Sequence, residues 1–475
     1  MTVVNDLRRM FRPASIAVIG ASREAGKVGY SVVKNIVEGG YRGGVYPVNP
    51  RATEILGLKC YPRVADIPGP VDVAIICVPA AIVPSLMAEL GAKDVPVAVV
   101  LSSGFAETGN QGLHSALVDA ARTAGVRVLG PNIFGYYYTP VNLCATFCIP
   151  YTKRGSIALT CQSGGVGMAV IGFTRAHGVG VSAIVGLGNK ADLDEADLLE
   201  FFAQDAHTAV VAMHIEDLKN GRRFLEVAGR VSKVKPIVAL KVGRTESGAR
   251  AAASHTAALT GEDSVYEAAF RQGGVLRART LEDLFDWARV LTVLPPPPGE
   301  NVVIHTGAGG LGVILSDACH DHGLRLMAVP QDLEHELRQH IPPFGSFTNP
   351  VDITGASPPK TYAATARLLL MDTRVHSLVF GYWQTIITPP MAFAEAIAAV
   401  VDEARAVGIR KPVVASLSGD VAVEDAATYL EERGIPSYPY APERAVAALA
   451  AVYQWSRHRA SPVTGGRADL SAPRP

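Results

Sequence analysis

Residues 155–178 read GSIALTCQSGGVGMAVIGFTRAHG, and this stretch decides the fold. It begins with a short apolar run, passes through a glycine-rich turn, and continues with apolar residues at helical spacing. That order is typical of the first strand and first helix of a doubly wound α/β sheet. Small residues at the turn allow a ligand to approach the backbone, and the helix that follows begins with unpaired N–H groups. The stretch therefore predicts a parallel sheet and marks a candidate ligand site.

The same pattern recurs in residues 300–323, ENVVIHTGAGGLGVILSDACHDHG, which align with residues 155–178 without a gap at a shift of 145 positions (300 − 155). Farther along, KPIVA at residues 235–239 matches KPVVA at residues 411–415. A repeat of this length indicates two copies of one small doubly wound domain.

Short apolar runs alternate with helix-like segments along the whole chain. Strands without strict alternation of polar and apolar residues are typical of parallel sheets that are buried on both faces. The fold class is therefore α/β. The predicted strands are residues 15–20, 71–78, 95–102, 126–129, 155–160, 210–215, 236–242, 301–306, 375–380 and 412–417.

Two interruptions divide the chain. Residues 136–155 have no clear period and include Pro140 and Pro150, so we place a domain junction near residue 150. Residues 295–298 are four consecutive prolines, which form a stiff connector. The predicted domains are residues 1–150, 151–293 and 299–460, followed by a disordered tail at residues 461–475.

Composition excludes several classes of protein. The 44 basic and 44 acidic residues cancel, which argues against a nucleic-acid or membrane-surface binder. Hydrophobic residues make up 48% of the chain, enough for packed cores. No targeting signal or membrane span is expected. The six cysteines lack CxxC spacing, so they indicate buried thiols in a reducing cytoplasm and no metal site, even at the close pair Cys144 and Cys148.

The first domain has the layout of a dinucleotide-binding fold. Its first strand, residues 15–20, runs into a small-residue turn, but the glycine spacing is not G-x-G-x-x-G. The second strand ends in Asn49, Pro50 and Arg51, where an NAD-binding protein would offer an acidic residue to the ribose. The ligand is therefore not expected to be NAD. Lys27 and Arg51 either contact a phosphorylated ribose or pyrophosphate, or are solvated surface cations.

One histidine lacks a structural reason. His255 lies in residues 244–261, a segment rich in small residues that predicts a mobile loop present in only one copy of the repeat. A neutral imidazole is a nucleophile toward phosphoryl groups, and a carboxylate can orient it. Glu216 ends the strand at residues 210–215 and would project from the carboxyl edge of the same sheet. The alternative is that Glu216 begins a surface turn.

The two glycine-rich turns are candidate phosphate sites. Two helix N-termini facing each other could hold a phosphate from both sides. The alternative is that the glycines only permit tight packing of strand against helix. The residues concerned are Ser163, Gly164 and Gly165 in one copy and Gly309 and Gly310 in the other.

Taken together, these motifs resemble the ADP-forming acyl-CoA synthetases of the succinyl-CoA synthetase-like superfamily, from residue 7 to about residue 451. The resemblance implies a Rossmann-like CoA-binding domain followed by two flavodoxin-like domains of the succinyl-CoA synthetase type. The motifs that carry it are AVIGAS at 17–22, GKVG at 26–29, YPVNP at 46–50, LGPN at 129–132, QSG at 162–164, GNKAD at 188–192, AAASHT at 251–256 and NPVD at 349–352.

By resemblance, His255 is phosphorylated and moves between sites, Glu216 supports the phosphohistidine, and the two turns hold its phosphate. Phosphohistidine would convert a small carboxylic acid to an acyl phosphate, from which the thiol of coenzyme A releases phosphate and forms acyl-CoA. Asn132 would lie near the acyl carbon. The implied CoA-binding residues are Gly20, Ala21, Ser22, Lys27, Asn49, Pro50, Val78, Pro79, Ser102 and Ser103.

The repeat leaves no room for an ATP-grasp module, so the chain looks like an α-type subunit of a hetero-oligomer whose β-type partner binds ATP and Mg. Two departures concern the acyl pocket. The family usually has Asn-Cys-Leu-Gly where this chain has NIFG at 132–135. Phe134, the tyrosines at 136–138 and the pair Tyr382 and Trp383 would adapt the pocket to a larger or aromatic acid, or else serve in ordinary packing.

Two other functions remain open on the sequence. One is a CoA-binding regulator that has lost turnover, because the ATP-grasp module is missing. The other is an NAD(P)-dependent oxidoreductase built on the first domain, against which the missing ribose-binding acid argues.

Overall fold

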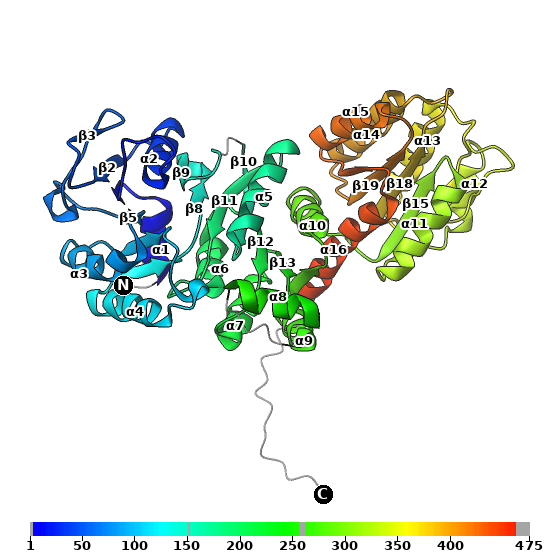
Figure 1. The fold of residues 1–475 in the computed structure, drawn as a ribbon. Coiled ribbons are helices and arrows are strands. Elements are labelled where there is room, and N and C mark those ends of the chain that lie inside the picture. The colour runs from blue at the N-terminus through cyan, green and yellow to red at the C-terminus, as the bar shows by residue number, and fades with distance from the viewer. Residues whose placement is uncertain (1–2, 151–152, 257–261, 462–475) are drawn as a thin grey trace, which may run out of the picture. The chain divides into compact units, whose positions relative to one another are not determined.

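The computed structural model describes residues 3–150, 153–256 and 262–461, and for residues 252–256 only the backbone. The chain forms two compact units, Met1–Val293 and Leu294–Pro475, and the division falls just before the proline run (Figure 1). Each unit is α/β, as predicted. Among the helices of the described ranges, none is long and apolar enough to cross a lipid bilayer.

The first sheet of unit 1 has five parallel strands in the order β2-β1-β5-β6-β7. Every residue of the three central strands is buried, which explains their continuous apolar sequences. The strands are β1 (Ser15–Ile19), β2 (Gly44–Val48), β5 (Val73–Ile76), β6 (Val97–Val100) and β7 (Arg127–Leu129), with a small hairpin of β3 (Glu54–Ile55) and β4 (Leu58–Lys59). The helices are α1 (Val3–Phe11), α2 (Val28–Glu38), α3 (Val83–Ala92) and α4 (Gln111–Ala124).

The second sheet of unit 1 has seven strands in the order β14-β13-β12-β10-β11-β8-β9. The pairs β11–β8 and β8–β9 are antiparallel, and the other pairs are parallel. Helix α5 contacts β10 and β11, and helix α10 contacts β10, β12, β13 and β14, while α7 packs against both α6 and α9. The strands are β8 (Gly135–Tyr138), β9 (Leu143–Thr146), β10 (Arg154–Cys161), β11 (Val181–Gly186), β12 (Val210–Ile215), β13 (Ile237–Lys241) and β14 (Val275–Ala278). The helices are α5 (Gly164–Ala176), α6 (Glu195–Gln204), α7 (Gly221–Val231), α8 (Glu246–Thr256), α9 (Asp263–Gly273) and α10 (Leu281–Val293).

The hairpin of β8 and β9 joins the two halves of unit 1. Residues 135–146 fall within the predicted first domain, but in the structure β8 pairs with β11 of the second sheet. Phe11 of α1 stacks on Phe201 of α6 with ring centroids 4.4 Å apart and meets Tyr136 edge-on at 5.8 Å. Aromatic pairs of this kind contribute about 0.5–1.5 kcal/mol each beyond the area that they bury. The two sheets of unit 1 therefore share one core.

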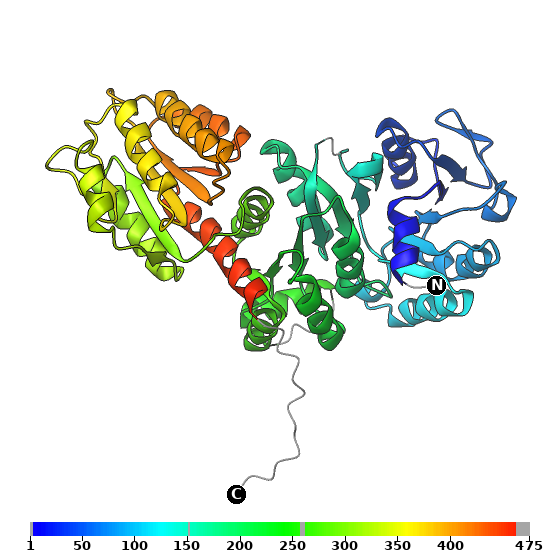
Figure 2. The same cartoon turned by 180° about the vertical axis from the view of Figure 1, so that it is seen from behind.

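Unit 2 contains a single large sheet in the order β16-β15-β18-β19-β20, and β17 also pairs with β15. Helices α13, α14 and α15 pack side by side, as do α11 and α16, and the two opposite views show these groups on opposite faces of the sheet (Figures 1 and 2). The strands are β15 (Asn301–Thr306), β16 (Arg325–Leu326), β17 (Val351–Asp352), β18 (Ser377–Trp383), β19 (Val413–Ser418) and β20 (Ser437–Pro439). The helices are α11 (Gly309–Asp321), α12 (Gln331–Leu337), α13 (Pro359–Met371), α14 (Pro390–Ala406), α15 (Ala422–Glu432) and α16 (Pro442–Ala460).

The predicted repeat is confirmed element by element. Helices α5 and α11 begin and end at residues that differ by the same 145 positions (309 − 164 and 321 − 176). The two matched lysines also make matched contacts: Lys235 donates to the carbonyl oxygens of Phe202 and Asp205, and Lys411 to those of Leu370 and Asp372. Each lysine thus satisfies carbonyl groups at the end of a helix that precedes its strand.

The predicted mobile loop around His255 is in large part helix α8. Glu246–Thr256 lies 176 positions before Ala422–Glu432 (422 − 246), so α8 is the counterpart of α15 and not an insertion. Alanine has the highest helix propensity, and Glu246 and Arg250 form an ion pair one turn apart. The prediction of a loop was therefore wrong for residues 246–256, and residues 257–261 lie outside the described residues.

Candidate functional site

A pocket of about 630 Å³ lies in unit 1, where the carboxyl ends of strands from both of its sheets meet. Most of the wall is made of short segments that directly follow β5, β6, β7, β10 and β11, at the sheet edge where ligands of open α/β folds bind, and Val28, Phe147 and Met168 complete it. The lining residues are Val28, Cys77, Val78, Pro79, Leu101, Ser102, Ser103, Asn132, Ile133, Phe134, Phe147, Gln162, Ser163, Gly164, Gly165, Met168, Gly188 and Asn189. Eight residues selected from the sequence are among them, namely Val78, Pro79, Ser102, Ser103, Asn132, Ser163, Gly164 and Gly165.

The other predicted CoA-binding residues lie beside this wall, after β1 and β2. Gly20 has a φ of +84°, and a Cβ there would come within 2.9 Å of Val78, so only glycine allows this approach. The side-chain amide of Asn49 donates to the carbonyl oxygen of Ala21 over 2.7 Å and ties the two turns together. Ser22 accepts from the N–H of Glu24 at 3.0 Å.

Lys27 and Pro50 are exposed, and Lys27 stands at the N-cap position of α2. The first turn of α2 carries no acidic residue, so the partial positive charge of its N-terminus adds to that of the lysine. A cation and free N–H groups in one place suit a phosphate or pyrophosphate. Arg51, the other cation considered at this edge, is exposed as well.

The glycines after β10 fall into two kinds. A Cβ on Gly164 would meet nothing within 4 Å, and one on Gly165 would meet only the Ser163 hydroxyl at 4.0 Å. A Cβ on Gly167 would lie 2.2 Å from the ring of Phe134. Packing therefore explains Gly167 but not Gly164 or Gly165, which leave the first turn of α5 open on the pocket side. Ser163 caps α5 by accepting from the N–H of Val166 at 3.4 Å.

Unit 2 repeats this division of roles. A Cβ on Gly310 would meet nothing within 4 Å, whereas one on Gly312 would lie 3.2 Å from both Pro350 and Thr306. Gly309 is intermediate, since its Cβ would approach a carboxylate oxygen of Asp352 at 3.0 Å. The first turn of α11 has no acidic residue. The proposed phosphate-binding role of this turn stays a prediction.

The aromatic residues expected to enlarge the acyl pocket mostly serve in packing. The hydroxyls of the three buried tyrosines of β8 bond to Met10, Ile149 and Asp205 respectively, and none of the three lines the pocket. Tyr382 is fully buried and stacks on Phe393 in the core of unit 2. Phe134 does line the pocket, but it is only 1% exposed because most of its ring fills the space left by Gly167.

Three polar side chains, those of Asn132, Asn189 and Glu107, form a hydrogen-bonded chain at the pocket that the sequence did not single out as a group. Asn189 lines the pocket, and its amide nitrogen donates to Glu107 at 2.5 Å. Burial by itself would raise the pKa of Glu107, but hydrogen bonds from the N–H of Gly104 and from Asn189 outweigh it and hold that pKa below its usual value. The carboxylate therefore stays charged and fixes Asn189. Asn132 has a φ of +65° and donates to Asn189 over 3.5 Å.

Glu216 directly follows β12 and is 6% exposed, so it does not begin a surface turn. Its N–H donates to the side-chain oxygen of Gln162 at 2.9 Å, which places it beside the residue that precedes Ser163. The side chain of His255 lies outside the described residues. Its helix, α8, contacts the short helix Ala106–Thr108 that contains Glu107.

Sequence reasoning missed Gln162 and Lys190 as functional candidates, although both stand inside quoted motifs. It also missed Phe147, Met168 and Val28, three apolar residues of the pocket wall. No signal in one sequence marks such residues, because their role depends on which strands become neighbours.

Comparisons with known proteins match three consecutive segments of the chain to family models. Residues 14–138 match the CoA binding domain, residues 154–291 the succinyl-CoA ligase like flavodoxin domain, and residues 302–462 the ligase-CoA domain. The α subunit of acetate–CoA ligase (ADP-forming) I from Pyrococcus furiosus is 47% identical over 461 residues, which cover 96% of this chain and 99% of that protein.

Two further relatives agree. Acetate–CoA ligase (ADP-forming) from Methanocaldococcus jannaschii is 39% identical and longer, so that 95% of this chain covers 63% of it. A solved structure of the dinucleotide-forming acetyl-coenzyme A synthetase 1 of Candidatus Korarchaeum cryptofilum, in complex with phosphate and ADP, superposes with a TM-score of 0.92 at 44% identity and covers 96% of this chain and 98% of that one. The chain therefore belongs to the ADP-forming acyl-CoA synthetases, which are acid–CoA ligases of the succinyl-CoA synthetase-like superfamily, and it corresponds to their α-type subunit.

Proposed function

We propose that this chain, with a separate ATP-grasp β-type partner, joins a small carboxylic acid to coenzyme A while ATP is converted to ADP and phosphate. The observation that carries the proposal is the pocket of unit 1, where residues selected for CoA, for the acyl group and for phosphate line one space. The two chain lengths among the relatives support a separate partner, because one relative is itself an α subunit and another is longer.

CoA would lie along the turns after β1, β5 and β6. Its phosphates would meet Lys27 and the N-terminus of α2, where the backbone and the ammonium supply positive charge. Its pantetheine arm would pass Val78, Pro79, Ser102 and Ser103 into the pocket. ATP and Mg would be bound by the partner.

We propose that His255 carries the phosphoryl group and that Glu216 orients its imidazole. The phosphorus–nitrogen bond of phosphohistidine breaks as an oxygen of the substrate carboxylate bonds to phosphorus, which gives an acyl phosphate. The CoA thiolate then attacks the acyl carbon, and phosphate leaves with the electrons of the carbon–oxygen bond. The open first turn of α5 suits both steps, because its N–H groups stabilise negative charge on the phosphoryl oxygens without rearranging.

The acid is small and largely apolar. The pocket is lined by the apolar residues Ile133, Phe134, Phe147 and Met168 as well as by the polar residues Asn132 and Asn189. The pantetheine arm must occupy much of the pocket, and the ring of Phe134 is fixed by its packing against Gly167. Little volume is left for the acyl group, so we propose acetate or another short acid as substrate. The six cysteines are all free thiols, which supports the proposed cytoplasmic location.

The test is phosphorylation of this chain. With the ATP-grasp partner and ³²P-labelled ATP, we expect an acid-labile, alkali-stable label on the wild-type chain that is discharged by acetate and CoA together. His255→Asn should abolish the label, while His177→Asn, a change at the C-terminal end of α5, should retain it. An unchanged label in His255→Asn, or no label on the wild type, contradicts the proposal.

A further inference from the structure

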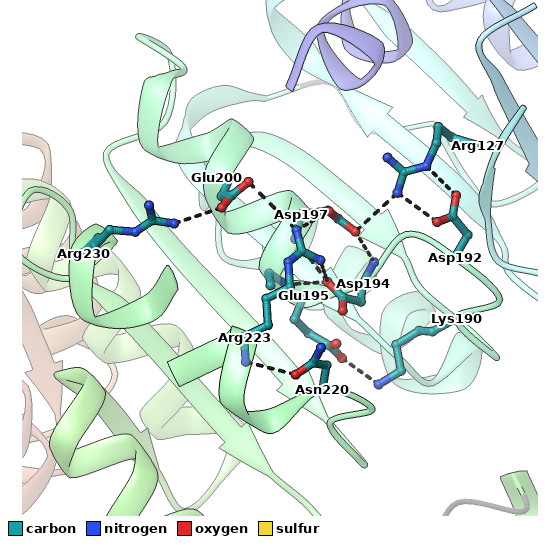
Figure 3. Close-up of polar contacts among 11 residues, drawn as sticks. Arg127, Lys190, Asp192, Asp194, Glu195, Asp197, Glu200, Asn220, Arg223 and Arg230 are labelled. Atoms are coloured by element: carbon teal, nitrogen blue, oxygen red, sulfur yellow. Dashed lines mark hydrogen bonds and ion pairs between the residues drawn. The ribbon is translucent and has the colours of Figure 1, made fainter. Parts of the chain in front are cut away.

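Lys190 is a fully buried cation next in sequence to Asn189, a residue of the pocket wall. Its side chain has no exposed surface, and its φ of +51° places it in a left-handed turn directly after Asn189. Its ammonium group lies 2.9 Å from a carboxylate oxygen of Glu195 and 2.9 Å from one of Asp217. Figure 3 shows the side chain of Lys190 directed at Glu195.

Burial by itself would lower the pKa of Lys190, but the two carboxylates outweigh it and raise that pKa above its usual value. The ammonium group is therefore charged, and it donates to two further acceptors, the backbone carbonyl of Asp217 at 2.7 Å and the side-chain oxygen of Gln162 at 3.2 Å. A buried charge is tolerated only when its partners are arranged around it, so this group constrains all four of its acceptors.

The contact with Gln162 has consequences for the proposed site. The same Gln162 oxygen accepts from the N–H groups of Glu216 at 2.9 Å and Asp217 at 3.1 Å, while its amide nitrogen donates to the Asp217 carboxylate. Gln162 directly precedes Ser163, the N-cap residue of α5. It thus links the start of α5 to the turn after β12, which carries Glu216. Lys190 holds both ends of this link through Gln162 and Asp217.

We propose that Lys190 is a positioning residue for the phosphoryl-transfer steps: it holds Gln162 and Asp217 so that the turn of Glu216 and the first turn of α5 keep one geometry. This inference rests on the proposed function. Lys190 touches no reacting atom in this arrangement. Its loss should therefore slow phosphoryl transfer and leave CoA binding intact, because the CoA residues lie on the turns of the other sheet.

The competing explanation is that Lys190 only neutralises Glu195, and the variants are chosen to separate the two. Lys190→Met leaves the Glu195 carboxylate buried without its cation, so it can lose stability for that reason alone. Lys190→Met combined with Glu195→Gln removes both charges and restores electrical balance. Asp192→Asn is the matched control. Asp192 lies in the same loop as Lys190, but its ion pair is with Arg127, and Figure 3 shows this pair apart from Lys190.

The measurement is single-turnover discharge of the ³²P-labelled phosphoenzyme by acetate and CoA, in the complex with the ATP-grasp partner. We expect the double variant to melt within a few degrees of wild type and to bind CoA within about twofold of its affinity, yet to discharge at least about tenfold more slowly, which corresponds to about 1.4 kcal/mol on the barrier. Asp192→Asn should discharge at the wild-type rate.

Discharge of the double variant at the wild-type rate overturns the inference and leaves the proposed function standing. A parallel fall of melting temperature, CoA affinity and discharge rate in that variant shows a merely structural role and also overturns it. If the wild-type chain takes no label on His255, the proposed function fails and this inference fails with it.

Discussion

Replacement of Gly167 by alanine tests the packing that shapes the pocket. In helix α5 a Cβ at this position would lie 2.2 Å from Cε1 of Phe134, with further contacts at 2.9 and 3.0 Å to the same ring. The ring is 1% exposed, and a Cβ built on Gly186 would also come within 3.1 Å of it, so Phe134 can yield only toward the pocket that it lines. The new methyl group must therefore displace the ring or the helix.

The expected cost follows from two opposing effects. Overpacking a core costs about 1–3 kcal/mol, and the severity of this contact points to the upper half of that range. Alanine in place of glycine within a helix contributes about 1 kcal/mol in the other direction. We expect a net loss of about 1–2 kcal/mol in the free energy of unfolding, and a melting temperature lower by about 2–8 °C for a domain of this size.

The assay is urea and thermal unfolding of four proteins: wild type, Gly167→Ala, Phe134→Leu, and the double variant. If the clash with the ring is the cause, Gly167→Ala should be neutral or stabilising by up to about 1 kcal/mol in the Phe134→Leu background, because only the helix propensity remains. Gly164→Ala, where a Cβ meets nothing within 4 Å, is the control and should lose no stability, because no clash opposes the helix propensity of alanine. An equal loss from Gly167→Ala in both backgrounds would refute this reasoning.

Two further predictions concern buried polar groups. Burial lowers the pKa of His305 in β15 to about 3, below the usual 6.5. Between these two pH values the unfolded chain binds a proton on this histidine and the folded chain does not. Unit 2 therefore loses stability as the pH falls, by up to about 1.4 kcal/mol per pH unit. Urea unfolding at several pH values should show a shallower slope in His305→Gln, and equal slopes would contradict the assignment. The Tyr138 hydroxyl donates to Asp205 at 2.8 Å in a buried site, so Tyr138→Phe should lower the free energy of unfolding by about 1–2 kcal/mol, and unchanged stability would show that the bond contributes nothing.

Much of the fold follows from local patterns. All ten strands predicted from apolar runs are present within a few residues of the expected bounds, because a strand buried on both faces needs a continuous apolar sequence. Strand β11 was not named, although its sequence, VSAIVG, is equally apolar and fully buried. The ends of these strands also revealed eight of the eighteen residues of the pocket wall, since ligand sites of α/β sheets form where parallel strands end.

The prediction around His255 failed because of two opposing signals. Residues 246–256 contain few large apolar side chains, which favours a loop, but they are rich in alanine, which favours a helix. Alignment of residues 235–239 with residues 411–415, when continued, places Glu431 opposite His255, and Glu431 lies in helix α15. The register thus pairs the segment with a helix, and the interpretation of the segment as an inserted loop, which rested on its small-residue composition, was wrong.

The sequence by itself determined the α/β class, the duplication of a strand–turn–helix unit and the residues at the strand ends, because these depend on short-range periodicity and on backbone requirements that single residues reveal. Only the tertiary structure decided that β8 and β9 join the second sheet, that Phe134 rests against Gly167, and that Lys190 reaches Gln162 and Asp217. These features depend on contacts between segments that are distant in the chain, and the energy of such a contact is set by which neighbours the completed fold brings together.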